Sequence, residues 1–337
     1  MEDKIRIICG IIYLLFVCCS LTINILLLIV LIKGNKEFKK SSFFILAWQL
    51  LLCDFMALTT PVFLSVPTTI AGYQFYSDFF NCFFSFFDKT AYYGTLLFAF
   101  ILTINRFMVF LFPKTNEKFF GNPEIFYTVV FGWILLAAFL IPLTLGGSYN
   151  FFNPVLFRLI NMKIDNRPWY SLHIMEPIAD HFSQFIPWVM IVIYVITFLE
   201  IRFGIYTRIR YGADSISTTL PPTNASKTKK RGEIRILLQC FIICSVFQIE
   251  WAAFNYLPKL PELLPFIEPY VNTMTSIMTV CMNTVHSIVI FTFTTRARTL
   301  LKSLFTNVQT NSMFSNAIFI IQKKPSIAPI VQFRRSV

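Results

Sequence analysis

The stretch Asn105-Arg106-Phe107-Met108-Val109-Phe110-Leu111-Phe112-Pro113 closes an apolar run that begins at Phe83. A helix crosses the hydrocarbon core of a bilayer in about 20 residues, and the run from Phe83 to Phe112 is longer than that. Its charged residues lie toward its two ends, where long side chains can reach the membrane surface. We therefore predict that Phe83–Phe112 is a membrane span.

Six further runs share this character, namely Ile5–Ile32, Ser42–Val66, Ile125–Gly147, Phe182–Tyr206, Ile234–Leu257 and Phe266–Thr294. The whole chain of 337 residues is 56% hydrophobic and only 14% charged, whereas soluble domains are about 25% charged. The first run is too long for a signal peptide and no small-residue cleavage site follows it, so we expect it to be retained. The prediction is an all-α membrane protein, a seven-transmembrane helix bundle.

The basic residues indicate the orientation of this bundle. One set of connections holds 22 of the 29 Lys and Arg residues, in the segments Lys33–Lys40, Arg106–Lys118, Arg202–Arg235 and Arg296–Arg335. Connections rich in Lys and Arg stay in the cytoplasm. We expect an extracellular N-terminus and a cytoplasmic C-terminus, and no nucleic-acid partner, because the net charge of +12 is spread over membrane-flanking clusters.

Two segments outside the spans have a composition of their own. Residues 211–232 are rich in Ser, Thr, Pro and Lys, which predicts a flexible cytoplasmic loop. In residues 296–305 basic side chains alternate with Leu and Phe, which predicts a short amphipathic helix on the membrane surface. We expect residues 1–305 to form one membrane domain and residues 306–337 a flexible cytoplasmic tail.

The stretch from Asn105 to Pro113 resembles the Asp-Arg-Tyr segment, with Pro seven residues after the Arg, that ends the third span of rhodopsin-like receptors. Asn24, Asp54 and Trp133 stand in the first, second and fourth spans, where that superfamily keeps its Asn, Asp and Trp. Four such positions in order make the resemblance specific.

Within that superfamily the chain is most similar to nematode serpentine chemoreceptors of class x, over roughly residues 15–302. The motifs are Asn-Arg-Phe followed by Phe-Pro, then Phe198-Leu199-Glu200-Ile201 in the fifth span and Arg231-Gly232-Glu233-Ile234-Arg235 before the sixth. The resemblance implies a chemosensory receptor of the plasma membrane, including that of a sensory cilium. Its partners would be an external small-molecule or peptide ligand, a heterotrimeric G protein and membrane lipid.

The resemblance also implies which residues act. Those for G-protein coupling are Asn105, Arg106, Phe107 and Pro113. A polar core that could hold water or a sodium ion comprises Asn24, Asp54, Thr95, Asn283 and His286. Apart from that sodium ion at Asp54, we expect no cofactor or metal. Asp54 could instead serve only to join the spans by hydrogen bonds.

The outer halves of the third and sixth spans supply the ligand-binding candidates Asp88, Tyr92, Glu250, Trp251 and Asn255. Asp88 stands where amine-binding receptors keep a carboxylate, but Lys89 follows it directly, and we favour a solvated acid near a helix end. Glu250 is expensive to bury in a membrane, so it is either a pocket residue or a structural one.

The chain departs from the superfamily pattern at four places. Asn105 replaces the acid that usually restrains the Arg, and the sixth span lacks Cys-Trp-x-Pro. In the seventh, His286-Ser287-Ile288-Val289-Ile290 stands in place of Asn-Pro-x-x-Tyr. Gly146–Phe185 contains no Cys to pair with Cys82. These departures leave open a receptor-like protein with weakened signalling.

Two other classes of protein fit the sequence less well. An enzyme is not expected, because no Ser/His/Asp, Cys/His or phosphate-binding-loop pattern is present. A seven-span transporter or channel remains an alternative. It would need a continuous polar pathway, whereas the spans carry only scattered charges.

Overall fold

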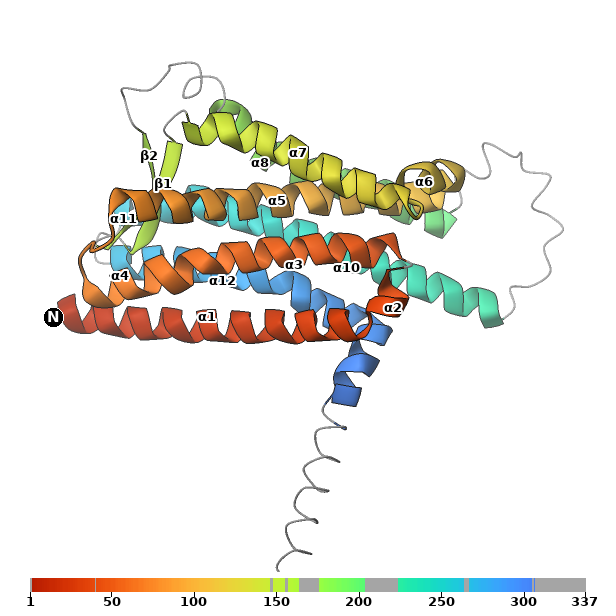
Figure 1. The fold of residues 1–337 in the computed structure, drawn as a ribbon, viewed down its shortest axis with the longest axis horizontal. Coiled ribbons are helices and arrows are strands. Elements are labelled where there is room, and N and C mark those ends of the chain that lie inside the picture. The colour runs from red at the N-terminus through yellow and green to blue at the C-terminus, as the bar shows by residue number, and fades with distance from the viewer. Residues whose placement is uncertain are drawn as a thin grey trace, which may run out of the picture.

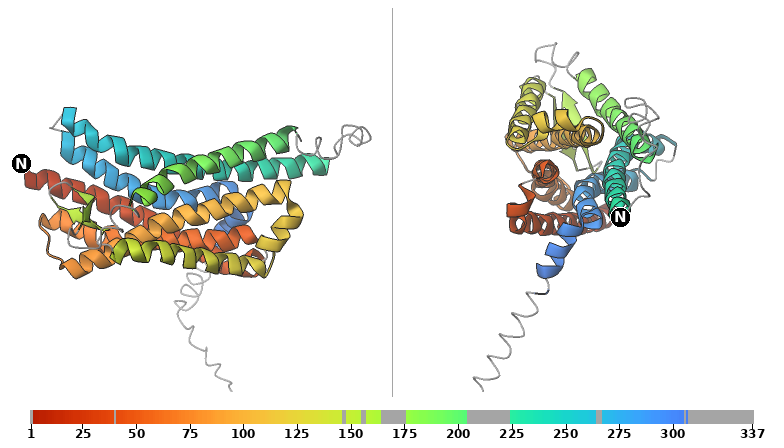
Figure 2. Two further views of the ribbon diagram at one scale, coloured as in Figure 1. Left: turned by 90° about the horizontal axis from the view of Figure 1, so that it is seen from above. Right: turned by 90° about the vertical axis from the view of Figure 1, so that its right-hand side faces the viewer.

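The computed structural model describes residues 2–39, 41–145, 148–154, 157–163, 176–203, 224–263, 267–304 and 306. Seven long helices lie side by side (Figure 1) and are grouped around a common centre when viewed end-on (Figure 2). They are α1 (Glu2–Lys33), α3 (Ser42–Thr60), α5 (Asp78–Leu111), α7 (Glu124–Leu145), α8 (Glu176–Phe203), α10 (Asn224–Tyr256) and α12 (Glu268–Phe293). This is the predicted all-α bundle with its small additions.

Six of these helices are long and apolar enough to cross a membrane within the part of the chain that the structure describes; α10 is the seventh member of the bundle. It packs against α8 and α12. Its first three turns, NASKTKKRGEIR, are polar, and they extend the helix beyond the expected start at Ile234. Ala, Lys, Arg and Glu favour a helix even in water, which explains the extension.

The second span is longer than expected and is not uniform. After α3 it continues through a π-helical turn, η1 (Pro61–Ser65), and a short helix, α4 (Val66–Ala71). Pro61 lacks an amide proton, and the regular hydrogen-bond ladder cannot pass through it. The span ends at Gly72, whose φ of 80° lies in the left-handed region that suits glycine.

The interior of the bundle is filled by aliphatic and aromatic side chains. The fully buried ones include Leu46, Leu50 and Phe98. Helices α3 and α5 approach closely at Gly94, where an added Cβ would lie 2.8 Å from Cys53 Sγ. Large apolar side chains also cover the outer faces, as expected for helices that face lipid.

A β-hairpin lies at one end of the bundle, which we call the hairpin end (Figure 1). Its strands, β1 (Ser148–Asn153) and β2 (Arg158–Lys163), pair antiparallel from Ser148 opposite Lys163 to Asn153 opposite Arg158. Strand β1 contacts α5 and α7, and β2 contacts α12. Sequence reasoning treated this segment as an exposed loop and missed the hairpin. The short elements η4 (Leu257–Lys259) and α11 (Leu260–Leu263) belong to the connection between α10 and α12.

The opposite end of the bundle carries α2 (Asn35–Phe38) and α6 (Pro113–Phe120). Beyond α12 the backbone becomes extended at Thr294 and then helical again over residues 295–304. In that second helix Ala297 is buried, whereas Arg296 and Lys302 are exposed, as predicted for an amphipathic surface helix. The expected flexible tail and most of the 211–232 loop lie outside the described residues.

Candidate functional site

A cavity of about 530 Å³ opens between the helices near the hairpin end. Its walls come chiefly from α5, α8, α10 and α12, and β1 and β2 contribute Asn150 and Leu159. A volume of this size suits a small organic ligand. The third, fifth, sixth and seventh of the predicted spans therefore enclose a common space.

One face of α10 supplies much of this wall. Its cavity-lining residues recur at the spacing of a helix face and are Phe247, Glu250, Trp251, Phe254 and Asn255. From α5, Asp88 and Tyr92 line the same cavity. The structure thus gathers all five ligand-binding candidates around one space.

Asp88 is held by the hairpin. Helix α5 begins at Asp78, so Asp88 lies well inside the helix, and the preferred interpretation of a solvated acid near a helix end was wrong. Asn150 Nδ2 donates to Asp88 Oδ2 at 2.8 Å, and the backbone N–H of Asn150 donates to Ser85 Oγ at 2.5 Å. Asn150 therefore joins β1 to α5 through two neighbouring turns of the helix.

The hairpin is attached to the other side of the bundle as well. Ser276 Oγ of α12 donates to the backbone carbonyl of Phe157 at 2.9 Å. Phe157 has a φ of 53°, a left-handed conformation that is uncommon for a residue with a side chain. The hairpin consequently bridges α5 and α12 across the end of the cavity.

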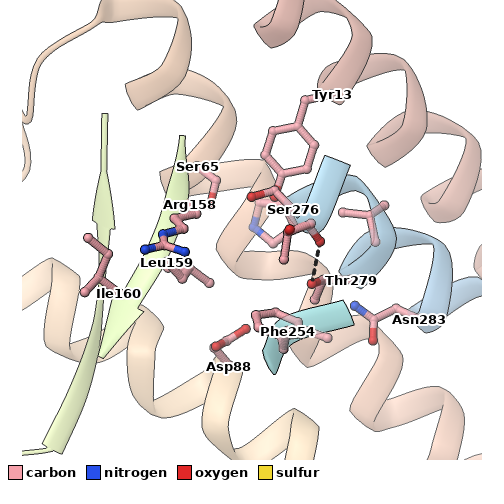
Figure 3. A pocket seen from close by; sticks show the side chains of 14 residues that line it. Tyr13, Ser65, Asp88, Arg158, Leu159, Ile160, Phe254, Ser276, Thr279 and Asn283 are labelled. Atoms are coloured by element: carbon pink, nitrogen blue, oxygen red, sulfur yellow. Dashed lines mark hydrogen bonds between the residues drawn. The ribbon is translucent and has the colours of Figure 1, made fainter. Parts of the chain in front are cut away.

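A smaller cavity of about 240 Å³ adjoins the first one, and Figure 3 shows its lining. Asp88, Phe254, Thr279 and Asn283 line both cavities. Arg158 of β2 and Ser65 of the π-helical turn are both among the residues that line it (Figure 3). The two cavities share part of their walls, and polar groups from five elements, namely α1, η1, α5, β2 and α12, line the smaller one.

The expected polar core lies directly beneath these cavities. His286 Nδ1 and Asp54 Oδ1 are 3.3 Å apart, and both side chains are buried. Asn24 Nδ2 donates to the backbone carbonyl of Asn283 at 3.1 Å. Thr95, Asn283 and His286 line the larger cavity. The cavity thus reaches the acid–imidazole pair.

Sequence reasoning missed three members of this core. Ser287 Oγ donates to Asn24 Oδ1, and Thr284 Oγ1 donates to Ser20 Oγ at 2.6 Å. Both bonds join α1 to α12. Of the three, only Ser20 gave a signal in the sequence, because Ser20 and Asn24 are four residues apart in α1 and so occupy one face. Two more buried or partly buried bonds tie the bundle: Tyr194 OH to Thr103 Oγ1 at 2.9 Å, and Trp133 Nε1 to Gln49 Oε1 at 2.9 Å.

Part of the oxygen set that a sodium ion would need around Asp54 is already engaged, although Asp54 Oδ2 itself has no hydrogen-bond partner among the described residues. A hard cation takes several oxygen ligands, but the side-chain oxygen of Asn24 already accepts from Ser287 and the carbonyl of Asn283 already accepts from Asn24. His286 occupies one oxygen of Asp54. Among the described residues, no cluster of three or more His, Cys, Asp or Glu side chains is arranged to hold a metal.

The coupling candidates lie at the end opposite the hairpin. The guanidinium carbon of Arg106 lies 4.6 Å from the centre of the Phe43 ring, a cation–π contact with α3. Pro113 is the first residue of α6, and the ring of Phe107 lies 5.9 Å from that of Phe112. Arg106 is therefore placed against the start of α3.

Asn105 has a different set of partners from the acid that it replaces. It is fully buried, it accepts from Ser42 Oγ at 3.4 Å, and its Nδ2 donates to Asn116 Oδ1 at 3.0 Å. These bonds join the end of α5 to the start of α3 and to α6. Sequence reasoning missed Ser42 and Asn116, for which no motif gave a signal.

The chain resembles known proteins in both sequence and fold. The sequence model of the family described as serpentine type 7TM GPCR chemoreceptor Srx matches residues 15–294. The crystal structure of squid rhodopsin superposes with a TM-score of 0.73 at 14% identity, over 92% of this chain and 88% of the other. No curated protein sequence matches the chain. The family match confirms the predicted resemblance, and the rhodopsin likeness confirms the fold class.

Proposed function

The chain belongs to the Srx family of serpentine seven-transmembrane chemoreceptors, and on that premise we propose that it detects a small external ligand and activates a heterotrimeric G protein. Family and fold are those of receptors and not of enzymes. The observation that carries the proposal is the placement of a ligand-sized cavity and an Arg106 site at opposite ends of the same helix, α5.

A ligand can act only through a difference in its affinity for two bundle states. The cavity supports this, because α5, α8, α10 and α12 all contribute to its walls. Helix α12 carries cavity residues and also the His286 contact to α3. A ligand that brings α10 and α12 closer together would change the geometry of the contact between His286 and Asp54, and with it the packing of the helices around that contact.

At the far end, the proposed coupling surface consists of Arg106, Phe107, Pro113 and the Asn105 network. The guanidinium of Arg106 offers five donors in a rigid fork, suited to the free carbonyls at the end of a docking helix. The basic residues of α2, α6 and residues 295–304 lie at this end of the bundle. We propose that this end faces the cytoplasm and that the hairpin end lies outside the plasma membrane.

The proposal is tested by co-expressing the receptor with G-protein α subunits of each class and measuring nucleotide exchange in membranes. We expect exchange above that of matched membranes with at least one class, and further stimulation by a member of a ligand panel. No exchange with any class, at a surface density verified by antibody, would contradict the G-protein part of the proposal.

A further inference from the structure

Glu250 is the one acid of the larger cavity that has been left without compensation. Its side chain is only 6% exposed and faces the cavity from α10. Among the described residues, no hydrogen bond or ion pair to its carboxylate is formed. A buried acid without a partner in a membrane span is energetically costly. The presence of Glu250 at this position therefore points to a partner from outside the chain.

The other acids of the cavity are already balanced or lie at its edge. Asp88 accepts from Asn150 at 2.8 Å, and the charge of the neighbouring Lys89 acts on it. Asp180 is exposed. Asp88 and Glu250 line the same cavity. Two carboxyl groups around one space favour a positive group between them, and Glu250 is the one that the described residues leave without a hydrogen bond.

Aromatic side chains complete the surroundings of Glu250. Trp251 follows it on α10, and Tyr92 faces it from α5. Aromatic faces attract organic cations, most strongly where water is excluded. A carboxylate flanked by aromatic rings in a cavity of about 530 Å³ is a site for an amine that carries an apolar body.

We propose that the ligand carries a cationic nitrogen that pairs with Glu250, with Tyr92 and Trp251 against its apolar part. This inference rests on the proposed receptor function and assigns a chemical class to its ligand. It makes Glu250, and not the hairpin-bound Asp88, the primary anchor. Lys89 also lines this cavity, and its single positive charge is outnumbered by the two acids Asp88 and Glu250.

The test uses the purified full-length receptor in lipid nanodiscs and follows its thermal midpoint. The probes are phenethylamine, the neutral analogue 2-phenylethanol and the anionic analogue phenylacetate, each at millimolar concentration. We expect only phenethylamine to raise the midpoint. Glu250→Gln keeps the shape of the side chain but removes the carboxylate. It should lower the apparent affinity for phenethylamine, read from the rise in thermal midpoint with probe concentration, by about 30-fold or more.

A stability measurement separates a binding role from a structural one. If Glu250 exists to hold a ligand, Glu250→Gln without any probe should melt at the same temperature as wild type or higher, since an uncompensated buried charge is removed. Glu124→Gln, the same change at the opposite end of the bundle, should leave the amine effect intact.

Three outcomes would overturn the inference: no shift with phenethylamine, an equal shift in Glu250→Gln, or stabilisation by phenylacetate. Basal nucleotide exchange is measured on the same preparations. If the wild type shows nucleotide exchange but phenethylamine does not raise its thermal midpoint, only the ligand class is refuted. If the wild type shows no nucleotide exchange, the result counts against the receptor proposal.

Discussion

Asp54 and His286 are 232 positions apart in the chain, yet Asp54 Oδ1 lies 3.3 Å from His286 Nδ1, with no more than 5% of either side chain exposed. The contact joins α3 to α12 in the middle of the bundle, directly below the larger cavity. Because water is largely excluded there, the two groups depend on each other for compensation.

We therefore expect a double-mutant cycle of Asp54→Asn and His286→Gln to show coupling. Each single variant leaves the other group without its partner, so the two losses in the free energy of unfolding should overlap by on the order of 1–3 kcal/mol. The measurement is thermal or denaturant unfolding in nanodiscs. Strictly additive losses would show that the 3.3 Å contact contributes nothing.

The contact between Asp54 and His286 also leads to a prediction about the effect of sodium ions. We expect basal nucleotide exchange by the wild type to be equal in sodium chloride and in N-methylglucamine chloride of the same ionic strength, because His286 takes up one carboxylate oxygen of Asp54. Replacing the imidazole in His286→Asn supplies an oxygen ligand, and sodium should then lower basal exchange. The double variant with Asp54→Asn is the control and should not respond. Lower basal exchange by the wild type in sodium chloride would contradict this prediction and support sodium binding at Asp54.

Arg106→Ala should abolish G-protein activation while leaving surface expression and ligand binding close to wild type, because the guanidinium lies at the end of α5 remote from the cavity. Arg106→Lys keeps the charge but not the planar fork and should retain only part of the activity. Lys118→Ala, on the exposed side of α6, serves as the control. Wild-type exchange by Arg106→Ala at equal surface density would remove the coupling role.

Asn105→Asp should lower basal activity, because an acid beside Arg106 restrains it in the resting state. The pair is worth on the order of 1 kcal/mol, which corresponds to about a fivefold lower basal signal. Asn116 can turn its amide so that it donates to the new carboxylate. In contrast, Asn105→Ala removes the bonds to Ser42 and Asn116 and should mainly lower stability. Unchanged or higher basal exchange in Asn105→Asp would refute the restraint.

The orientation has a direct test. An epitope tag at the N-terminus should be stained on intact cells, and a tag at the C-terminus only after permeabilisation, because 22 of 29 Lys and Arg residues lie in one set of connections. The reverse pattern would invert the assignment of cavity and coupling surface to the two sides of the membrane.

The helices of this fold could be predicted from sequence because lipid selects long apolar runs, and each such run is a local property of the chain. Their precise course could not be predicted. The second span passes through the π-helical turn Pro61–Ser65, and the polar start of α10 extends beyond the apolar run. The hairpin was missed since strands of six residues carry little periodic signal and depend on contacts with α5 and α12.

For the candidate site, residue type and position within a span were enough to select Asp54, His286 and Glu250, because charged or ionisable groups in lipid stand out. Pairing was harder. Asn116 is eleven residues from Asn105 and reaches it only because α6 folds back against α5. Ser and Thr side chains are also common in helices for other reasons, so Ser287 and Thr284 gave no distinct signal before α1 and α12 were seen together.

The way in which the hairpin is fastened has a consequence for how and where the protein can work. It is held to α5 through Asn150 and to α12 through Phe157 by hydrogen bonds, and residues 146–185 contain no cysteine. The attachment of the hairpin to α5 and α12 therefore needs no disulfide bond, and it withstands a reducing environment. Bonds of about 1 kcal/mol each are individually weak, so the attachment of the hairpin depends on the three bonds acting together.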